Sequence, residues 1–208
     1  MEPSFWLESW EEGKRGFHLD QPNPHLCENA HGAFGEGGRI LVPLCGATHD
    51  LEYLHRCGFD AVGVELSPIA VREVADRDGL AAVGPDRFEK PGIRLLLADF
   101  FETTPASVGP ITGIWDRAAL VALHPSQREA YVAHQRLLLG GKGTLLLNTL
   151  DYDATKADGP PWAVTEEAVK ALWPEAECIQ EHADSAPPRF AAAGITTITG
   201  RLYVARLG

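Results

Sequence analysis

Short apolar runs and amphipathic stretches alternate along the chain from residue 38 onward. A short apolar run is typical of a strand that a parallel sheet buries on both faces, and apolar positions three and four residues apart indicate a helix. The pattern predicts strands at residues 40–42, 61–66, 93–98, 111–115, 143–150, 176–182 and 196–206, and helices at 50–57, 68–78, 125–139 and 165–173. This order predicts an α/β fold in which helices cover both faces of a mostly parallel, seven-stranded sheet that an antiparallel C-terminal pair closes.

Three segments lie outside this alternation. Residues 80–92 contain a Gly-Pro and a Pro-Gly pair, which predict a loop. Residues 151–163 form a polar stretch around a Gly-Pro-Pro sequence, and a loop of that length indicates a functional role. The N-terminal block carries Trp6 and Trp10 four residues apart, on one face of a helix. We expect this block to fold across the end of the sheet as a helical lid.

The chain has 208 residues, a length typical of one domain with its own core. We expect a single domain in three parts: a lid segment at residues 1–37, a cofactor-binding core at 38–150, and a substrate-side part at 151–208.

Charge, cysteine content and the length of apolar runs limit the partners and the cellular compartment that we expect. The net charge is -11 and the 18 basic residues are scattered singly, so we expect neither a nucleic acid nor an anionic membrane as partner. The four cysteines form no regular framework, which favours free thiols in a reducing compartment. No apolar run reaches the length of a membrane span. We therefore expect a cytoplasmic protein, active as a monomer on a small molecule.

The most informative motif runs from Gly38 to Ser67 and has the order strand, turn, helix, strand. Gly46 permits a sharp turn after the first strand, and Glu65 ends the second strand, where open α/β sheets bind ligands. A carboxylate there can accept both hydroxyls of a ribose. The chain lacks the G-x-G-x-x-G sequence that binds a dinucleotide pyrophosphate, so a phosphate-free cofactor fits better than a nicotinamide. A structural turn with an incidental glutamate is the remaining alternative.

Motifs along nearly the whole chain together resemble one family. They are Phe5-Trp6 with Trp10, Gly16-Phe17-His18, Asn23-Pro24, Val42-Pro43-Leu44-Cys45-Gly46 with Asp50-Leu51, Val62-Gly63-Val64-Glu65-Leu66-Ser67, Trp115-Asp116-Arg117, Asp151-Tyr152-Asp153 and Gly159-Pro160-Pro161. In this order and spacing they resemble the thiopurine S-methyltransferase (TPMT) family. The resemblance implies a Rossmann-like class I methyltransferase fold and S-adenosyl-L-methionine as the cofactor.

The resemblance also implies where the cofactor binds. Trp6, Trp10 and Phe17 would cover it, and aromatic faces attract a sulfonium cation. Asp99 and Phe100 would flank the adenine. The implied cofactor-binding residues are Trp6, Trp10, Phe17, Leu44, Gly46, Glu65, Asp99, Phe100 and Arg117.

Two arginines are the implied catalytic residues. Arg117 and Arg189 would act on the acceptor, and with Phe17 they are the implied substrate-binding residues. A methyl group on a sulfonium is already activated, so the enzyme mainly aligns the reactants. An aromatic thiol reacts as its anion, which arginine favours, so no strong general base is needed. We expect no metal site, and we interpret Cys45 as a packing residue behind the turn, not as a nucleophile.

The predicted function is methyl transfer from S-adenosyl-L-methionine to the sulfur of a small aromatic thiol or thiopurine. The alternative is a methyltransferase that detoxifies halide, thiocyanate or selenium and tellurium oxyanions. A nicotinamide-dependent reductase and a non-catalytic cofactor-sensing module are the hypotheses from other classes. The position after the turn, where the family often has a basic residue, is Ala47 in this chain. Since loops shape substrate pockets, such departures affect the acceptor prediction more than the cofactor prediction.

Overall fold

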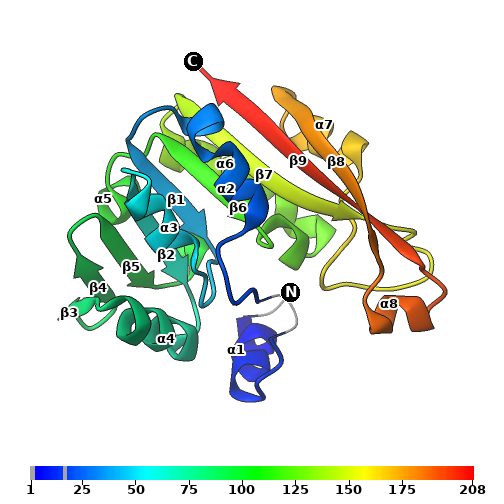
Figure 1. Ribbon diagram of the computed structural model, residues 1–208, viewed down its shortest axis with the longest axis horizontal. Helices are drawn as coiled ribbons and strands as arrows, with labels where there is room; N and C mark the ends of the chain where they lie inside the picture. The colour runs from blue at the N-terminus through cyan, green and yellow to red at the C-terminus, as the bar shows by residue number, and fades with distance from the viewer. Residues whose placement is uncertain (1–2, 16–17) are drawn as a thin grey trace.

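The computed structural model describes residues 3–15 and 18–208, which form one α/β unit around a nine-stranded sheet. The strand order is β3-β4-β5-β2-β1-β6-β7-β9-β8 (Figure 1). The five central strands are parallel: β5 (Ile93–Leu97), β2 (Asp60–Glu65), β1 (Arg39–Pro43), β6 (Gly113–Arg117) and β7 (Gly143–Asp151). The predicted α/β class with a mostly parallel sheet is confirmed.

The last two strands close one edge of the sheet as predicted. β9 (Thr197–Leu207) inserts between β7 and β8 (Ala176–Ser185) and is antiparallel to both. Burial alternates only in the first part of β9, and the consecutive residues Leu202, Tyr203, Val204 and Ala205 are all buried.

The prediction of a seven-stranded sheet is wrong by one hairpin at the opposite edge. Residues 80–92, predicted as a loop, contain β3 (Ala81–Gly84) and β4 (Arg87–Lys90), which pair antiparallel with each other and then with β5. Every residue of β3 is exposed, and β4 buries no side chain fully. β3 buries no residue, and β4 packs only Phe88 partly against the core, so the hairpin has no clear burial pattern in the sequence.

Helices cover both faces of the sheet (Figure 1). Alternate residues of each strand enter two separate cores, as the pleat requires. Leu41 packs in one core with Tyr131 and Trp173, whereas Ile40 packs in the other core with Leu54. The main helices are α2 (Pro24–Phe34), α3 (Asp50–Arg56) and α4 (Pro68–Asp78) on one face, with α5 (Pro105–Val108), α6 (Arg128–Leu139) and α7 (Glu166–Leu172) on the other.

Helix ends follow the sequence signals closely. The Ser67 hydroxyl accepts a hydrogen bond from the backbone N–H of Ala70, and Gly79 ends α4 in the left-handed conformation. Thr165 caps α7 in the same way. The helix predicted at 125–139 begins with a 3-10 turn (Pro125–Gln127).

The N-terminal block divides into two helices with different neighbours. α1 (Pro3–Glu11) lies beyond the carboxyl ends of the central strands, below the β1 arrowhead in Figure 1. α2 packs against the sheet, where Leu26 and Ala30 are buried and the Phe34 ring lies over Gly113. Of the N-terminal block predicted to form a lid, only α1 lies where a lid would lie. That α1 closes over a ligand stays a prediction. Within the described residues, no helix is long and apolar enough to cross a membrane.

Candidate active site

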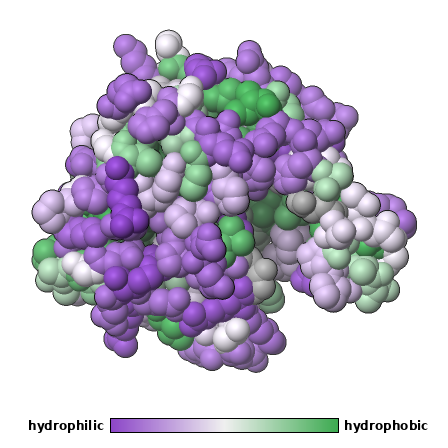
Figure 2. Space-filling model, in the orientation of Figure 1, coloured by the Kyte–Doolittle hydropathy of each residue, from purple (hydrophilic) through white to green (hydrophobic). Residues whose placement is uncertain are grey.

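A large cavity opens at the carboxyl edge of the parallel strands. Its volume is about 910 Å³, a size that holds a drug-sized ligand. In Figure 2 the surface is hollowed between the main body and the lobe on the right, where Figure 1 places α8 (Pro188–Ala192). The lining residues follow the strand order: Asp99 after β5, Glu65 on β2, Leu44 to Gly46 after β1, Arg117 on β6 and Asn148 on β7.

The turn after β1 brings backbone into the cavity wall. Leu44 and Gly46 both have positive φ values, 47° and 56°. A Cβ atom on Gly46 would lie 3.3 Å from Cζ2 of Trp10, so a side chain there would push against the indole of α1. Glycine at this position therefore allows a left-handed turn and close contact with α1 at once.

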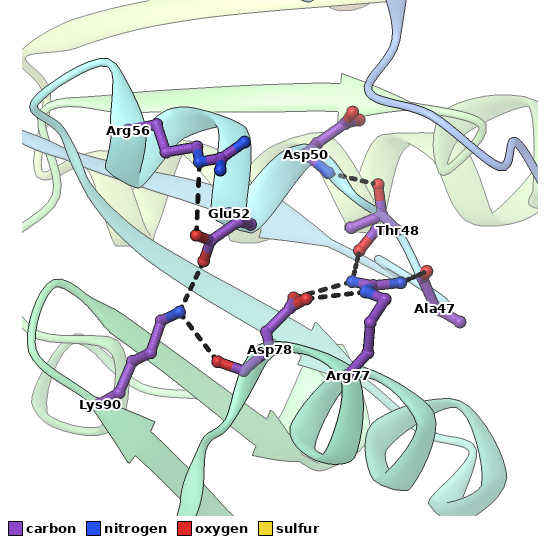
Figure 3. A network of polar contacts seen from close by, with 8 residues as sticks. All are labelled: Ala47, Thr48, Asp50, Glu52, Arg56, Arg77, Asp78 and Lys90. Atoms are coloured by element: carbon purple, nitrogen blue, oxygen red, sulfur yellow. Dashed lines mark hydrogen bonds and ion pairs between the residues drawn. The ribbon is translucent and has the colours of Figure 1, made fainter.

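Arg77, in the last turn of α4, holds this turn from outside (Figure 3). Its Nη1 donates to the carbonyl of Ala47 at 2.8 Å, and its Nη2 donates to the carbonyl of Thr48 at 2.6 Å. Asp78 fixes the guanidinium through hydrogen bonds of 2.7 and 2.8 Å. These hydrogen bonds attach the segment between β1 and α3 to α4.

Glu65 is buried at the cavity wall with both carboxylate oxygens engaged. Oε2 accepts from the backbone N–H of Gly46 at 2.8 Å, and Oε1 accepts from that of Ser67 at 2.7 Å. Burial raises the pKa of the Glu65 carboxyl, and these backbone N–H groups oppose that shift. Each carboxylate oxygen has more than one acceptor site, so the group can still accept hydroxyl protons from a ligand.

Asp99 and two phenylalanines follow at the end of β5. Oδ1 of Asp99 accepts from the backbone N–H of Phe101 at 2.9 Å, which starts a short 3-10 turn (Phe100–Glu102). Phe100 is buried against the rings of Tyr131 and His134, whereas Phe101 is exposed at the cavity wall. The sequence analysis did not predict Phe101 as a cavity residue, although it directly follows the predicted binding residues Asp99 and Phe100.

The three side chains of the Trp-Asp-Arg sequence at the end of β6 point in different directions. Two of them form hydrogen bonds on opposite faces of the sheet, and the third lies at its edge. The indole N–H of Trp115 donates to Asp50 at 2.7 Å on one face. On the other face Asp116 accepts from the Tyr131 hydroxyl and the Gln135 amide, each at 2.8 Å. Arg117, the last residue of the strand, lines the cavity. The motif thus fixes the strand end from which Arg117 projects.

Asp50 is a buried residue of the cavity wall that the sequence analysis placed in a family motif but not among the predicted binding residues. Its other oxygen accepts from the backbone N–H of Asn23 at 2.8 Å, so it joins α2, α3 and β6. Burial lowers the pKa of the Arg117 guanidinium, and the negative charge of Asp50 opposes this shift. The sequence shows that Asp50 follows the glycine turn, but it gives no sign of the partners on α2 and β6.

One part of the cavity wall, formed by α8, the Gly-Pro-Pro loop and their neighbours and here called the apolar half, carries mostly apolar side chains. Arg189 on α8 lies at its rim, donates to the carbonyl of Asp158 at 3.2 Å, and stacks over the Phe190 ring at 4.5 Å. The Gly-Pro-Pro loop contributes Pro160 and Pro161 to the wall, and the Tyr152 hydroxyl holds it by donating to the Pro161 carbonyl at 2.7 Å. The apolar lining here is Val121, Ala122, Leu123, Leu150, Pro160, Pro161, Pro187, Pro188, Phe190 and Ile198.

α1 supplies the aromatic part of the wall. Trp6 and Trp10 both line the cavity, and Trp10 is only 4% exposed. An ion pair of 2.5 Å between Arg15 and Glu73 of α4 holds the end of this segment, and the Arg15 guanidinium lies over the Trp10 ring. Phe17, predicted to bind cofactor and substrate, lies outside the described residues.

Cys45 lies beneath the turn and packs against β2. A Cβ atom on Gly63 would lie 3.0 Å from its sulfur, and burial together with the charge of Glu65 raises the pKa of the thiol well above its usual value. A thiol of this kind does not form the nucleophilic thiolate at neutral pH.

We expect Cys45→Ala to leave kcat within about twofold of the unmodified protein, with a loss of stability on the order of 1 kcal/mol for the removed sulfur. Steady-state kinetics and thermal melting measure the two effects. Loss of turnover with intact cofactor affinity would show instead that the thiol takes part in the reaction.

Sequence comparison places the chain among methyltransferases. The family model of thiopurine S-methyltransferase (TPMT) matches residues 1–207. A thiopurine S-methyltransferase of Methylococcus capsulatus is 38% identical over 214 residues, covering 98% of this chain and 96% of that protein. Another, from Gluconobacter oxydans, is 42% identical over 178 residues, covering 83% of this chain and 80% of that protein.

Solved structures with a similar fold are also methyltransferases. The 1,6-didemethyltoxoflavin-N1-methyltransferase of Burkholderia thailandensis, solved with 1,6-didemethyltoxoflavin and S-adenosylhomocysteine, has a TM-score of 0.64 and 20% identity over 99% of this chain and 86% of its own. A SAM-dependent methyltransferase from Anabaena variabilis has a TM-score of 0.68 and 14% identity over 99% and 95%. These similarities show the class I methyltransferase fold. Given that fold, the family match over nearly the whole length and relatives at 38% and 42% identity, the chain belongs to the thiopurine S-methyltransferase family of S-adenosylmethionine-dependent methyltransferases.

Proposed function

We propose that the protein methylates the sulfur of a small aromatic or heteroaromatic thiol. One observation carries this proposal: the cavity wall combines Arg117 and Arg189 with apolar residues of the Gly-Pro-Pro loop, α8 and β9. Apolar walls suit a planar ring, and two arginines suit the anionic sulfur of a thiolate. An inorganic oxyanion would leave these apolar walls without a partner.

The residues at the other half of the cavity fit the cofactor. Glu65 is buried at the end of β2 and would accept the ribose hydroxyls, and Asp99 with Phe100 would lie beside the adenine. Trp6 and Trp10 on α1 would cover the sulfonium side, where aromatic faces favour a cation. The turn from Leu44 to Gly46 offers backbone to the ligand without a glycine-rich phosphate cradle, as a phosphate-free cofactor requires.

S-adenosylmethionine supplies a methyl group that is already activated on a sulfonium. The chain's task is then to bind the acceptor as an anion, to orient its sulfur and to exclude water. Arg117 would orient the thiolate from the end of β6, with its own position fixed by Trp115 and the charge of Asp50. Arg189 would stabilise the anion from the opposite wall. No residue of the chain needs to remove a proton in the transfer step.

The test is to incubate the protein with S-adenosylmethionine and a panel of acceptors and to identify methylated products by mass spectrometry. The panel contains thiophenol, mercaptopyridines, a thiopurine, iodide, thiocyanate, selenite and tellurite. We expect methyl thioethers of the aromatic thiols to form fastest. Products from the inorganic acceptors alone would contradict the proposal and favour the detoxification alternative.

A thermal melt in the same samples separates binding of the cofactor from turnover. S-adenosylhomocysteine at 100 times its Kd should add about 2.7 kcal/mol of stability, which corresponds to a Tm increase of roughly 5–10 °C for a chain of this size. NAD should produce no such increase. A protein that binds S-adenosylhomocysteine but methylates no acceptor would be a cofactor-sensing module.

A further inference from the structure

His18 lies where the segment after α1 meets the start of α3. Its side chain lines the cavity and is partly accessible. The centre of its ring lies 6.5 Å from that of Trp10 and 6.2 Å from that of His49, which directly precedes α3. The imidazole therefore belongs to the part of the wall where Trp10 would cover the cofactor.

Charged groups from two neighbouring elements and from its own segment act on the His18 ring. Burial lowers the pKa of the imidazole, and His49 together with Arg77 of α4 lowers it further. Glu73 of α4 and Asp20 oppose this shift, but the pKa stays below its ordinary value. His18 is therefore neutral at neutral pH and gains a proton in mild acid.

The other cations of this segment keep their charge over the same range of pH. Arg15 pairs with Glu73, and Lys14 pairs with Glu12 at 2.6 Å. Lysine and arginine lose their protons only in strong base. Within residues 3–15 and 18–208, His18 is the only histidine that lines the cavity, so a change of its charge is what mild acid adds to this wall.

We propose that His18 makes the cavity distinguish the charged cofactor from its uncharged product according to pH. This inference rests on the cofactor site of the proposed function. S-adenosylmethionine carries a sulfonium, and S-adenosylhomocysteine, which is otherwise the same molecule, carries a neutral thioether in its place. A protonated His18 adds a like charge to the cavity that binds the sulfonium, and the two charges repel each other. Acid should therefore weaken binding of the cofactor and let the product compete with it.

Comparison of the two ligands isolates the effect of His18 from that of the carboxylates. Both ligands contain the same ribose and adenine, so protonation of Glu65 or Asp99 should lower both affinities alike. The ratio of the two Kd values therefore reports only a group that acts on the sulfonium charge.

Isothermal titration calorimetry between about pH 5 and 8, the range in which histidine changes its charge, tests this role. We expect the Kd of S-adenosylmethionine, divided by that of S-adenosylhomocysteine, to rise about fivefold as the pH falls through the pKa of His18. This is the size expected for two unit charges that repel each other across a partly solvated cavity. His18→Gln keeps a polar side chain without a titrating group, and its ratio should stay constant.

His49→Gln is the matched control, because it removes the neighbouring imidazole, which lies outside the cavity lining. Its ratio should still change with pH. The change should occur at a higher pH than in the unmodified protein, because His49 lowers the pKa of His18. A ratio that becomes constant in His49→Gln and not in His18→Gln would assign the effect to His49 and overturn the proposal.

Proton release gives a second measurement, which needs no variant. Near the pKa of His18, S-adenosylmethionine should displace more protons than S-adenosylhomocysteine does, seen as a stronger dependence of its binding enthalpy on the ionisation enthalpy of the buffer. Equal proton release by the two ligands, or a pH-independent ratio in the unmodified protein, would overturn the role of His18. Absence of methylation of every thiol would instead overturn the proposed acceptor and leave the role of His18 intact.

Discussion

Glu65→Ala should weaken binding of S-adenosylhomocysteine by about 1.5–3 kcal/mol, or roughly 10- to 150-fold in Kd. The buried carboxylate would supply two hydrogen bonds to the ribose, and bonds to a charged group are the stronger kind. Its removal also leaves the backbone N–H groups of Gly46 and Ser67 without their acceptors. Isothermal titration calorimetry measures the affinity, and melting without ligand shows how much of the loss comes from the turn itself.

Glu65→Gln is the matched control because its amide retains one acceptor oxygen and the same shape. We expect an intermediate affinity. The carboxyl has a raised pKa, so it becomes protonated at a higher pH than an exposed glutamate. Affinity of the unmodified protein should therefore fall as the pH drops through that raised pKa, and the glutamine variant should lack this dependence. Unchanged affinity in Glu65→Ala would remove this residue from the cofactor site.

Asp50→Ala should lower the free energy of unfolding by about 3–5 kcal/mol, the loss expected when one member of a buried charged group is removed. The substitution leaves the Trp115 indole N–H and the Asn23 backbone N–H without acceptors and removes the charge that faces Arg117. For a chain of 208 residues this corresponds to a decrease in Tm on the order of 10 °C. Denaturant unfolding measures the free energy directly.

Trp115→Phe separates the two effects, since it removes one hydrogen bond and keeps the Asp50 charge that opposes the shift in the Arg117 pKa. We expect a smaller loss than in Asp50→Ala, and a kcat/KM that is less affected. Equal losses of stability in both variants would show that the indole contact accounts for the whole effect, and that the charge of Asp50 contributes none.

The sequence patterns predict the buried strands well because each central strand is covered on both faces and consists of apolar residues. They fail at β3, where all residues are exposed and only backbone pairing defines the strand. They also miss α2, whose buried residues Leu26 and Ala30 are too few to show a clear helical period. A prediction based on burial cannot detect elements that bury little.

The same contrast applies to the site. Gly46 and Glu65 could be predicted because a turn and a strand end place them by local geometry. Asp50 required knowledge that α2 and β6 meet at the start of α3, and Asn148 required the register between β6 and β7. Contacts between segments far apart in the chain leave no periodic signal, so these residues emerge only from the fold.

α4 anchors two parts of the proposed cofactor wall, the turn after β1 and the end of the α1 segment, with bonds of different kinds. Arg77 fixes the turn through backbone carbonyls, whereas Glu73, one helical turn earlier, holds Arg15 through an ion pair whose side chains are 36% and 34% exposed. Dissolved salt screens an exposed ion pair far more than it affects a hydrogen bond to a carbonyl. Ionic strength should therefore change how fast ligands enter and leave past α1, while what the site recognises stays the same.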